Sequence, residues 1–270
     1  GDNDGKTGLY RQKRGNRRAG LRDRSFLMKE DMMKKKYDLV FGIGAACLCS
    51  QMLRKTGLQF SSYPFDWLYG TDFSGRVDIL TNDFKDFVNK EDLTFINATN
   101  GDKDNPCDVY NNVKNGITFN HDFPQGVPLE QSYPAVKAKY DRRIDRLLKR
   151  IERSENTLIV YVEIPTSPEN TTVETLLNCR EKLYRRFGKE NIDLLYVACA
   201  DERQDDLFGD HIRKIAFNYR KANGTDAAHD ARVLRDAVKG YRLRRPLSVR
   251  IKNQIYRLKK HFHRVFKTFG

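Results

Sequence analysis

Two apolar runs rich in β-branched residues constrain the fold most strongly. They cover residues 157–164 (TLIVYVEI) and residues 192–200 (IDLLYVACA). Runs of this kind are typical of strands that are covered on both faces, as in parallel sheets. Residues 172–188, which lie between them, have apolar side chains at helical spacing and end on a glycine. This strand–helix–strand order indicates parallel strands joined by a crossover helix.

The alternation of strands and helices extends over most of the chain. Residues 37–44 (YDLVFGIG) form a third buried-strand pattern, and residues 45–57 form a helix pattern that closes on Gly57. Residues 135–154 carry the apolar stripe of an amphipathic helix. The remaining predicted elements are a helix over 72–88 and strands over 93–98 and 116–124. We therefore predict one α/β domain over residues 37–236, with three layers and a mostly parallel sheet of Rossmann-like or SGNH-like type.

The excess of positive charge lies at the two ends of the chain. The net charge is +14, but residues 1–36 contribute +7 and residues 237–270 contribute +11, which leaves −4 for the middle. Residues 1–36 show no sustained periodicity, so we predict a flexible basic arm. After residue 241, large apolar residues recur at three- and four-residue steps with basic residues opposite them. This pattern predicts a basic amphipathic C-terminal helix over 241–269.

The predicted C-terminal helix has three candidate binding surfaces. Its apolar stripe can pack on its own domain, or it can lie on an anionic membrane, where each basic residue contributes about 1 kcal/mol. Nucleic acid is a weaker candidate partner, because the tail contains no base-reading motif. We expect the helix to contact an anionic membrane surface and to contribute nothing to the chemistry.

The composition argues against several other classes of protein. No apolar run approaches the ~18 residues that a membrane span needs, and the start of the chain has no signal-peptide pattern. Five cysteines occur without a CxxC pair, which disfavours disulfides and zinc ribbons. His, Cys and carboxylate residues show no metal-ligand spacing, so we predict no metal. We expect a cytoplasmic protein, peripheral to the membrane if the tail binds there.

The junction between the strand at 37–44 and the following helix is the first candidate site. Ligands gather at the carboxyl ends of parallel strands, and the positive end of a helix favours the thiolate of Cys47. The backbone amides of Gly44, Ala45 and Ala46 are then expected to bind an oxyanion. A packing role for Cys47 stays open, since buried cysteines are common. A dinucleotide loop fits less well, because only the first two glycines of Gly-x-Gly-x-x-Gly are present.

His121 is the second candidate, because it is the only histidine in a strand pattern of the middle of the chain. It can act as the base for a thiol, or it can be a structural histidine. We expect Cys47 and His121 to lie on adjacent strand ends. Two aspartates are candidates for orienting the imidazole. Asp66 lies in an aromatic-rich loop, and Asp122 is adjacent but would point to the opposite face of a regular strand.

Three motifs together resemble a known family. Residues 41–70 contain Gly-x-x-Cys and Ser-x-Pro-Phe-Asp-Trp, and residues 119–123 (FNHDF) contain His-Asp. These motifs are similar to those of a bacterial family of unknown function whose members are described as papain-like cysteine peptidases, and the similarity covers residues 37–200. The resemblance implies that Cys47 is the nucleophile of a cofactor-independent hydrolase acting on a peptide or acyl carbonyl. It further implies that His121 is the base and that Asp66 and Asp122 are acidic partners. Cys49 does not align with the cysteine of the family motif.

Two alternatives come from different classes of protein. The Gly-x-x-Cys start is also similar to a capsule-polysaccharide acetyltransferase family, which implies acyl transfer in surface-polysaccharide biosynthesis with coenzyme A as the cofactor. The charge pattern alone is compatible with a non-catalytic module that binds an anionic membrane or nucleic acid through its basic ends. The two enzyme hypotheses keep a reactive Cys47, and the third does not.

Overall fold

The computed structural model describes residues 30–165, 169, 171–219 and 233–244. Within these residues a central sheet has five strands in the order β2-β7-β8-β10-β9. The first four strands are parallel, and β9 pairs antiparallel with β10. The strands are β2 (Leu39–Gly42), β7 (Thr157–Val162), β8 (Ile192–Cys199), β10 (Ile212–Phe217) and β9 (Gln204–Phe208).

A second sheet is antiparallel throughout, in the order β3-β6-β5-β4. A further pair, β1 with β11, is parallel. The strands are β3 (Leu68–Tyr69), β6 (Thr118–Pro124), β5 (Cys107–Asn112), β4 (Leu93–Asn97), β1 (Lys36–Tyr37) and β11 (Arg242–Leu243). The predicted α/β class is confirmed. The prediction of a single, mostly parallel sheet of Rossmann-like or SGNH-like type is not confirmed, because the middle of the chain forms a separate antiparallel sheet.

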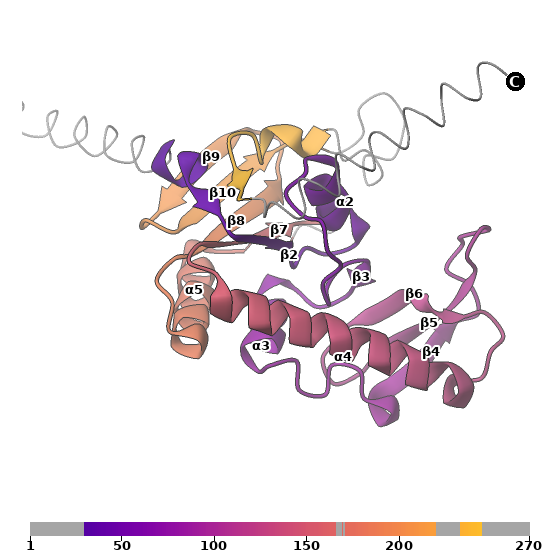
Figure 1. The fold of residues 1–270 in the computed structure, drawn as a ribbon. Coiled ribbons are helices and arrows are strands. Elements are labelled where there is room, and N and C mark those ends of the chain that lie inside the picture. The colour runs from indigo at the N-terminus through magenta and orange to yellow at the C-terminus, as the bar shows by residue number, and fades with distance from the viewer. Residues whose placement is uncertain (1–29, 166–168, 170, 220–232, 245–270) are drawn as a thin grey trace, which may run out of the picture.

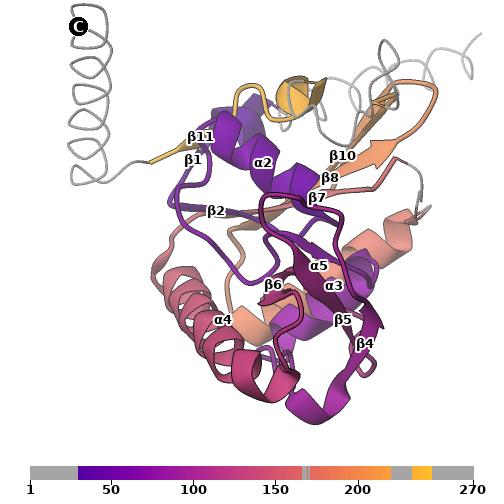
Figure 2. The same ribbon diagram turned by 90° about the vertical axis from the view of Figure 1, so that its right-hand side faces the viewer.

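Helices cover both faces of the central sheet (Figures 1 and 2). Helix α2 lies on one face, and α3, α4 and α5 lie on the other side. Their bounds are α2 (Cys47–Lys55), α3 (Phe73–Thr81), α4 (Leu129–Arg153) and α5 (Val173–Phe187), with 3₁₀ turns η1 (Lys90–Asp92) and η3 (Val233–Asp236). Strand side chains alternate between two cores, so that Tyr161 faces one and Val160 the other.

Helix α3 is shorter than the predicted helix over 72–88. It begins at Phe73 and ends at Thr81, and the side chain of the N-cap residue Asp72 accepts a hydrogen bond from the backbone N–H of Gly75. Asp83 and Phe84 then have φ values of 54° and 58°, which stop a right-handed helix. The turn carries Phe84 into the core beside Phe65. Burial of these aromatic rings therefore outweighs the helical spacing of the sequence.

The basic ends lie mostly outside the described residues. Of the predicted arm over 1–36, only residues 30–36 are described, and of the tail helix over 241–269, only the first four residues. Residues 242–243 form strand β11 beside β1, so a helix does not begin at 241. In the part of the chain that the structure describes, no helix has the length and hydrophobicity to span a membrane.

Candidate active site

The chain turns sharply between β2 and α2, and Cys47 is the first helical residue after the turn. The preceding residue, Ala46, has a φ of 75° and a ψ of −176°. This backbone region is essentially restricted to glycine, and any other residue in it costs about 1–3 kcal/mol. Gly44 is needed for close packing, because a Cβ there would lie 2.5 Å from the Cβ of Cys49. The turn thus fixes the thiol of Cys47 at the N-terminus of α2.

A fully buried arginine holds this turn in place. Arg76, on α3, is 0% exposed. Its guanidinium donates hydrogen bonds of 2.8 to 3.4 Å to the backbone carbonyls of Ile43, Gly44, Leu68, Gly70 and Thr71. Burial lowers the pKa of Arg76 to about 10, against the attraction of Glu169, so the group stays charged at neutral pH. One side chain therefore joins the turn before Cys47 to the loop that carries Tyr69.

The amides predicted to form an oxyanion hole are engaged in other hydrogen bonds. The N–H of Gly44 donates to the sulfur of Cys49. The N–H of Ala45 donates to the Val162 carbonyl at 3.3 Å, and that of Ala46 to the Leu68 carbonyl at 2.9 Å. The predicted oxyanion hole is therefore wrong, because pairing with β7 continues past the end of β2 at Ala45 and the other two amides donate to Leu68 and Cys49. The backbone N–H of Cys47 itself faces its own sulfur.

The half-buried thiol of Cys47 lies between two hydrogen-bonding side chains. The hydroxyl oxygen of Tyr69 is 3.5 Å from Sγ, and His121 hydrogen-bonds the same sulfur. Burial opposes ionisation, but these two bonds and the charge of His121 outweigh it, so the pKa of Cys47 is below its ordinary value of 9.0. The bond with Cys47, opposed by burial, raises the pKa of His121 above 6.5. Together the shifts favour a thiolate–imidazolium pair.

A bulge in β6 contains His121. The pairing of β6 with β5 runs from Phe119 to Phe123 on β6 while β5 advances only from Tyr110 to Asp108. Three residues of β6 (120–122) therefore stand opposite the single residue Val109 of β5, and bulges of this kind redirect side chains next to functional sites. Cys47 follows β2 in the central sheet, whereas His121 belongs to the antiparallel sheet. The expectation that the two residues lie on adjacent strand ends is thus wrong, although their side chains do meet.

Asn100 contacts the other side of the His121 ring. Its Nδ2 lies 3.2 Å from Nδ1 of His121, which leaves Nε2 for the thiol. The Asn100 Oδ1 accepts hydrogen bonds from the backbone N–H groups of Asp102 and Cys107. Its Nδ2 also donates to the carbonyls of Asn105 and Asn120. The amide therefore ties the loop between β4 and β5 to the bulge of β6 and orients the imidazole.

Asp66 belongs to a separate buried cluster. Its carboxylate accepts hydrogen bonds from the side chains of Gln59 and Arg54 and from the backbone N–H of Tyr63. Burial raises the pKa of Asp66 even though these contacts act in the opposite direction. Its described hydrogen bonds therefore fix the loop that follows α2, and none of them reaches His121.

Asp122 also directs its hydrogen bonds away from the imidazole. Its carboxylate accepts from the ammonium group of Lys139 and, at 2.9 Å, from the hydroxyl of Tyr140, which attaches β6 to α4. The negative charge of Asp122 still contributes to the raised pKa of His121. The structure thus places Cys47 and His121 together with Tyr69 and Asn100, two residues that the sequence pattern did not single out.

Cys49 has the opposite environment from Cys47. It is buried, burial raises its pKa to about 12, and its sulfur donates to the Val160 carbonyl at 3.4 Å. These properties are typical of a packing cysteine. Among the described residues, no group of three or more His, Cys, Asp or Glu side chains is arranged to hold a metal ion.

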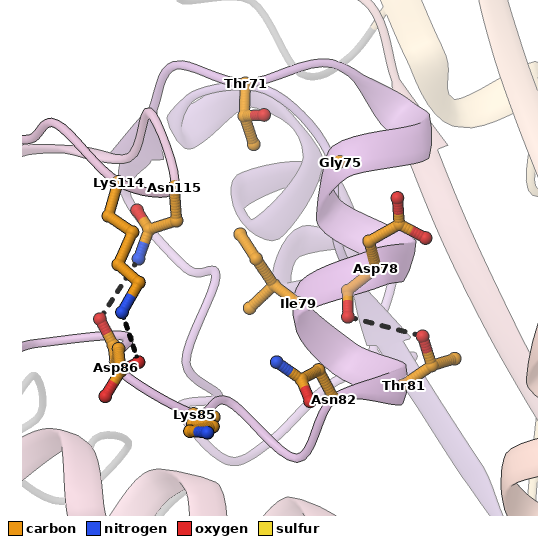
Figure 3. A pocket seen from close by; sticks show the side chains of 10 residues that line it. All are labelled: Thr71, Gly75, Asp78, Ile79, Thr81, Asn82, Lys85, Asp86, Lys114 and Asn115. Carbon is orange, nitrogen blue, oxygen red and sulfur yellow. Dashed lines mark hydrogen bonds and ion pairs between the residues drawn. The ribbon is translucent and has the colours of Figure 1, made fainter.

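A polar hollow of about 640 Å³ lies between α3 and the turn that joins β5 to β6 (Figure 3). Lys114 and Asp86 form an ion pair of 2.6 Å on one side of it. Asp78 and Ile79 of α3 lie on the other side. Neither Cys47 nor the side chains around it belong to its lining. The hollow is therefore distinct from the thiol site.

Comparisons with known proteins place the chain in a family. Residues 38–202 match the family described as "Putative papain-like cysteine peptidase (DUF1796)". An uncharacterized protein of Acanthamoeba polyphaga mimivirus, R408, is 25% identical over 185 residues, which is 63% of this chain and 81% of the relative. No solved structure matches the chain. Since the family match spans more than half of the sequence, including the turn at Cys47 and the bulge at His121, the chain belongs to this papain-like cysteine peptidase family.

Proposed function

We propose that the protein is a cysteine-dependent hydrolase that cleaves an acyl or peptide bond, with Cys47 as the nucleophile and His121 as its base. The observation that carries the proposal is the half-buried thiol of Cys47, which His121 hydrogen-bonds and whose pKa is lowered. Membership of the family supports a peptide as the substrate class.

The proposed reaction begins with transfer of the thiol proton from Cys47 to Nε2 of His121. The thiolate then attacks the carbonyl carbon of the substrate, and the imidazolium donates its proton to the leaving group. A thioester on Cys47 results, and water that His121 deprotonates hydrolyses it. Asn100 contacts Nδ1 on the other side of the ring and so keeps Nε2 directed towards the thiol.

Acyl transfer shares the thioester step and differs only in the acceptor. The test must therefore separate formation of the thioester from its breakdown. An activated ester such as p-nitrophenyl acetate does this, because release of p-nitrophenol reports acylation and the later steady rate reports deacylation. Added amines or alcohols that accelerate deacylation would identify a transferase; an unchanged rate would identify water as the acceptor.

We expect wild-type protein to release a burst of about one p-nitrophenol per chain and to carry the acetyl group on the peptide that contains Cys47. Cys47→Ala should show neither the burst nor the acetylated peptide. Cys49→Ala is the matched control on the same helix and should retain both. A burst that survives in Cys47→Ala, or a wild-type protein that reacts no faster than this variant, would contradict the proposed function.

A further inference from the structure

We infer that the hydroxyl of Tyr69 donates the hydrogen bond that stabilises the oxyanion formed when Cys47 attacks its substrate. The inference rests on the proposed function and adds a catalytic residue to it. An oxyanion hole needs donors held close to the place where negative charge develops. The amides of Gly44, Ala45 and Ala46 do not meet this need, because each already donates to a partner within the fold.

The hydroxyl of Tyr69 lies where a donor to the oxyanion is needed. Its hydroxyl oxygen is 3.5 Å from the sulfur of Cys47. In the part of the chain that the structure describes, the hydroxyl of Tyr69 forms its hydrogen bond with this sulfur. Once the Cys47 sulfur has bonded to the carbonyl carbon it is only a weak acceptor, so little is lost when the O–H turns to the charged oxygen. Burial and the neighbouring Cys47 raise the pKa of Tyr69 well above its usual value, so the proton stays on the hydroxyl.

The backbone holds Tyr69 fixed relative to Cys47. Strand β3 pairs Tyr69 with Thr118 of β6. The residues on either side of Tyr69 are held by Arg76, which bonds the carbonyls of Leu68 and Gly70. Gly70 has a φ of 75°, and a Cβ at this position would lie 1.9 Å from the Gly116 carbonyl oxygen, so the loop cannot shift freely. A donor fixed before the reaction needs no reorganisation during it.

The proposed step balances without a further reactant. A sulfur electron pair of the Cys47 thiolate forms the S–C bond, and the π pair of the carbonyl moves onto its oxygen. That oxygen accepts a hydrogen bond from Tyr69, whose proton stays on the hydroxyl. The oxygen pair then reforms the C=O bond, and the leaving group departs with the proton that His121 took from the thiol.

Two reagents distinguish this role from a simple effect on the thiolate. Iodoacetamide alkylates the thiolate by displacement of iodide and forms no oxyanion, whereas p-nitrophenyl acetate acylates it through one. Both rates on Cys47 are measured at a pH above the thiol pKa, where a change in thiolate fraction no longer matters. For Tyr69→Phe we expect acylation to fall by about 10²- to 10³-fold, with the plateau alkylation rate little changed.

Tyr133→Phe is the matched control, because it removes a hydroxyl from another part-buried tyrosine, one that bonds the Val88 carbonyl at 3.0 Å. The rates of acylation and alkylation of Cys47 in Tyr133→Phe should equal those of the wild type. Equal losses of acylation and alkylation in Tyr69→Phe, or no loss of acylation, would overturn the inference while leaving the proposed function intact. Failure of the wild type to be acylated at Cys47 would overturn both.

Discussion

Replacing Arg76 by methionine is expected to lower the free energy of unfolding by about 3–5 kcal/mol. Methionine keeps the apolar stem but leaves carbonyls of two segments without their donor. An unsatisfied buried acceptor costs about 1–3 kcal/mol, and relief of the buried charge offsets only part of the total. The segments affected are the turn before Cys47 and the loop around Tyr69, so the variant should also lose acylation.

Urea denaturation with matched variants tests this prediction. Arg185→Met removes an exposed arginine that pairs with Glu181 one helical turn away, and it should change stability by less than about 0.5 kcal/mol. A lower midpoint for Arg76→Met at an unchanged slope is the expected result. Equal midpoints for the two variants would show that Arg76 does not hold the turn and the loop together.

Replacing His121 by alanine is expected to slow acylation of Cys47 by about 10²- to 10⁴-fold at neutral pH. The variant loses the base and also the hydrogen bond and charge that lower the pKa of the thiol. His211→Ala is a suitable control, because the His211 ring bonds Asp193 at 2.7 Å. Asp193 lies near the start of β8, whereas Cys47 follows the carboxyl end of the parallel strand β2. Rates of p-nitrophenol release for both variants provide the measurement. A similar loss in the two would point to general destabilisation rather than base catalysis.

The sequence was sufficient to predict what depends on local pattern. The strands β2, β7 and β8 and the helix α5 were predictable from continuous apolar runs, helical spacing and a terminal glycine. The position of Cys47 was predictable for the same reason, since a buried strand, small residues and a helix follow one another directly. The predicted domain boundaries at 37 and 236 stay predictions.

The parts of the site that depend on long-range contacts could not be predicted. The meeting of His121 with Cys47 depends on a bulge in a second sheet, and period-2 reasoning assumes a regular strand. Asn100 precedes a glycine and has the pattern of a turn, so nothing local indicates its contact with the imidazole. Arg76 lies in an ordinary helical pattern, where an arginine is expected on the exposed face.

The same limitation explains the error in the predicted oxyanion hole and the separation of Asp66 from the imidazole. The amides of Gly44 to Ala46 were expected to point together at an oxyanion. In the fold, β7 and the loop at Leu68 supply acceptors from distant parts of the chain. Asp66 is close to Cys47 in sequence, yet Gln59 and Arg54 occupy its carboxylate.

The pH dependence of Cys47 alkylation shows whether His121 makes this cysteine a thiolate nucleophile. Iodoacetamide labelling with peptide mapping gives the rate for each cysteine from pH 5 to 10. Because only the thiolate reacts, the rate rises with pH through the pKa of the thiol. We expect a midpoint for Cys47 below 9.0 that moves upward in His121→Ala, with Cys49 unreactive over the same range. A wild-type midpoint at or above 9.0, or one that His121→Ala does not move, would contradict this expectation.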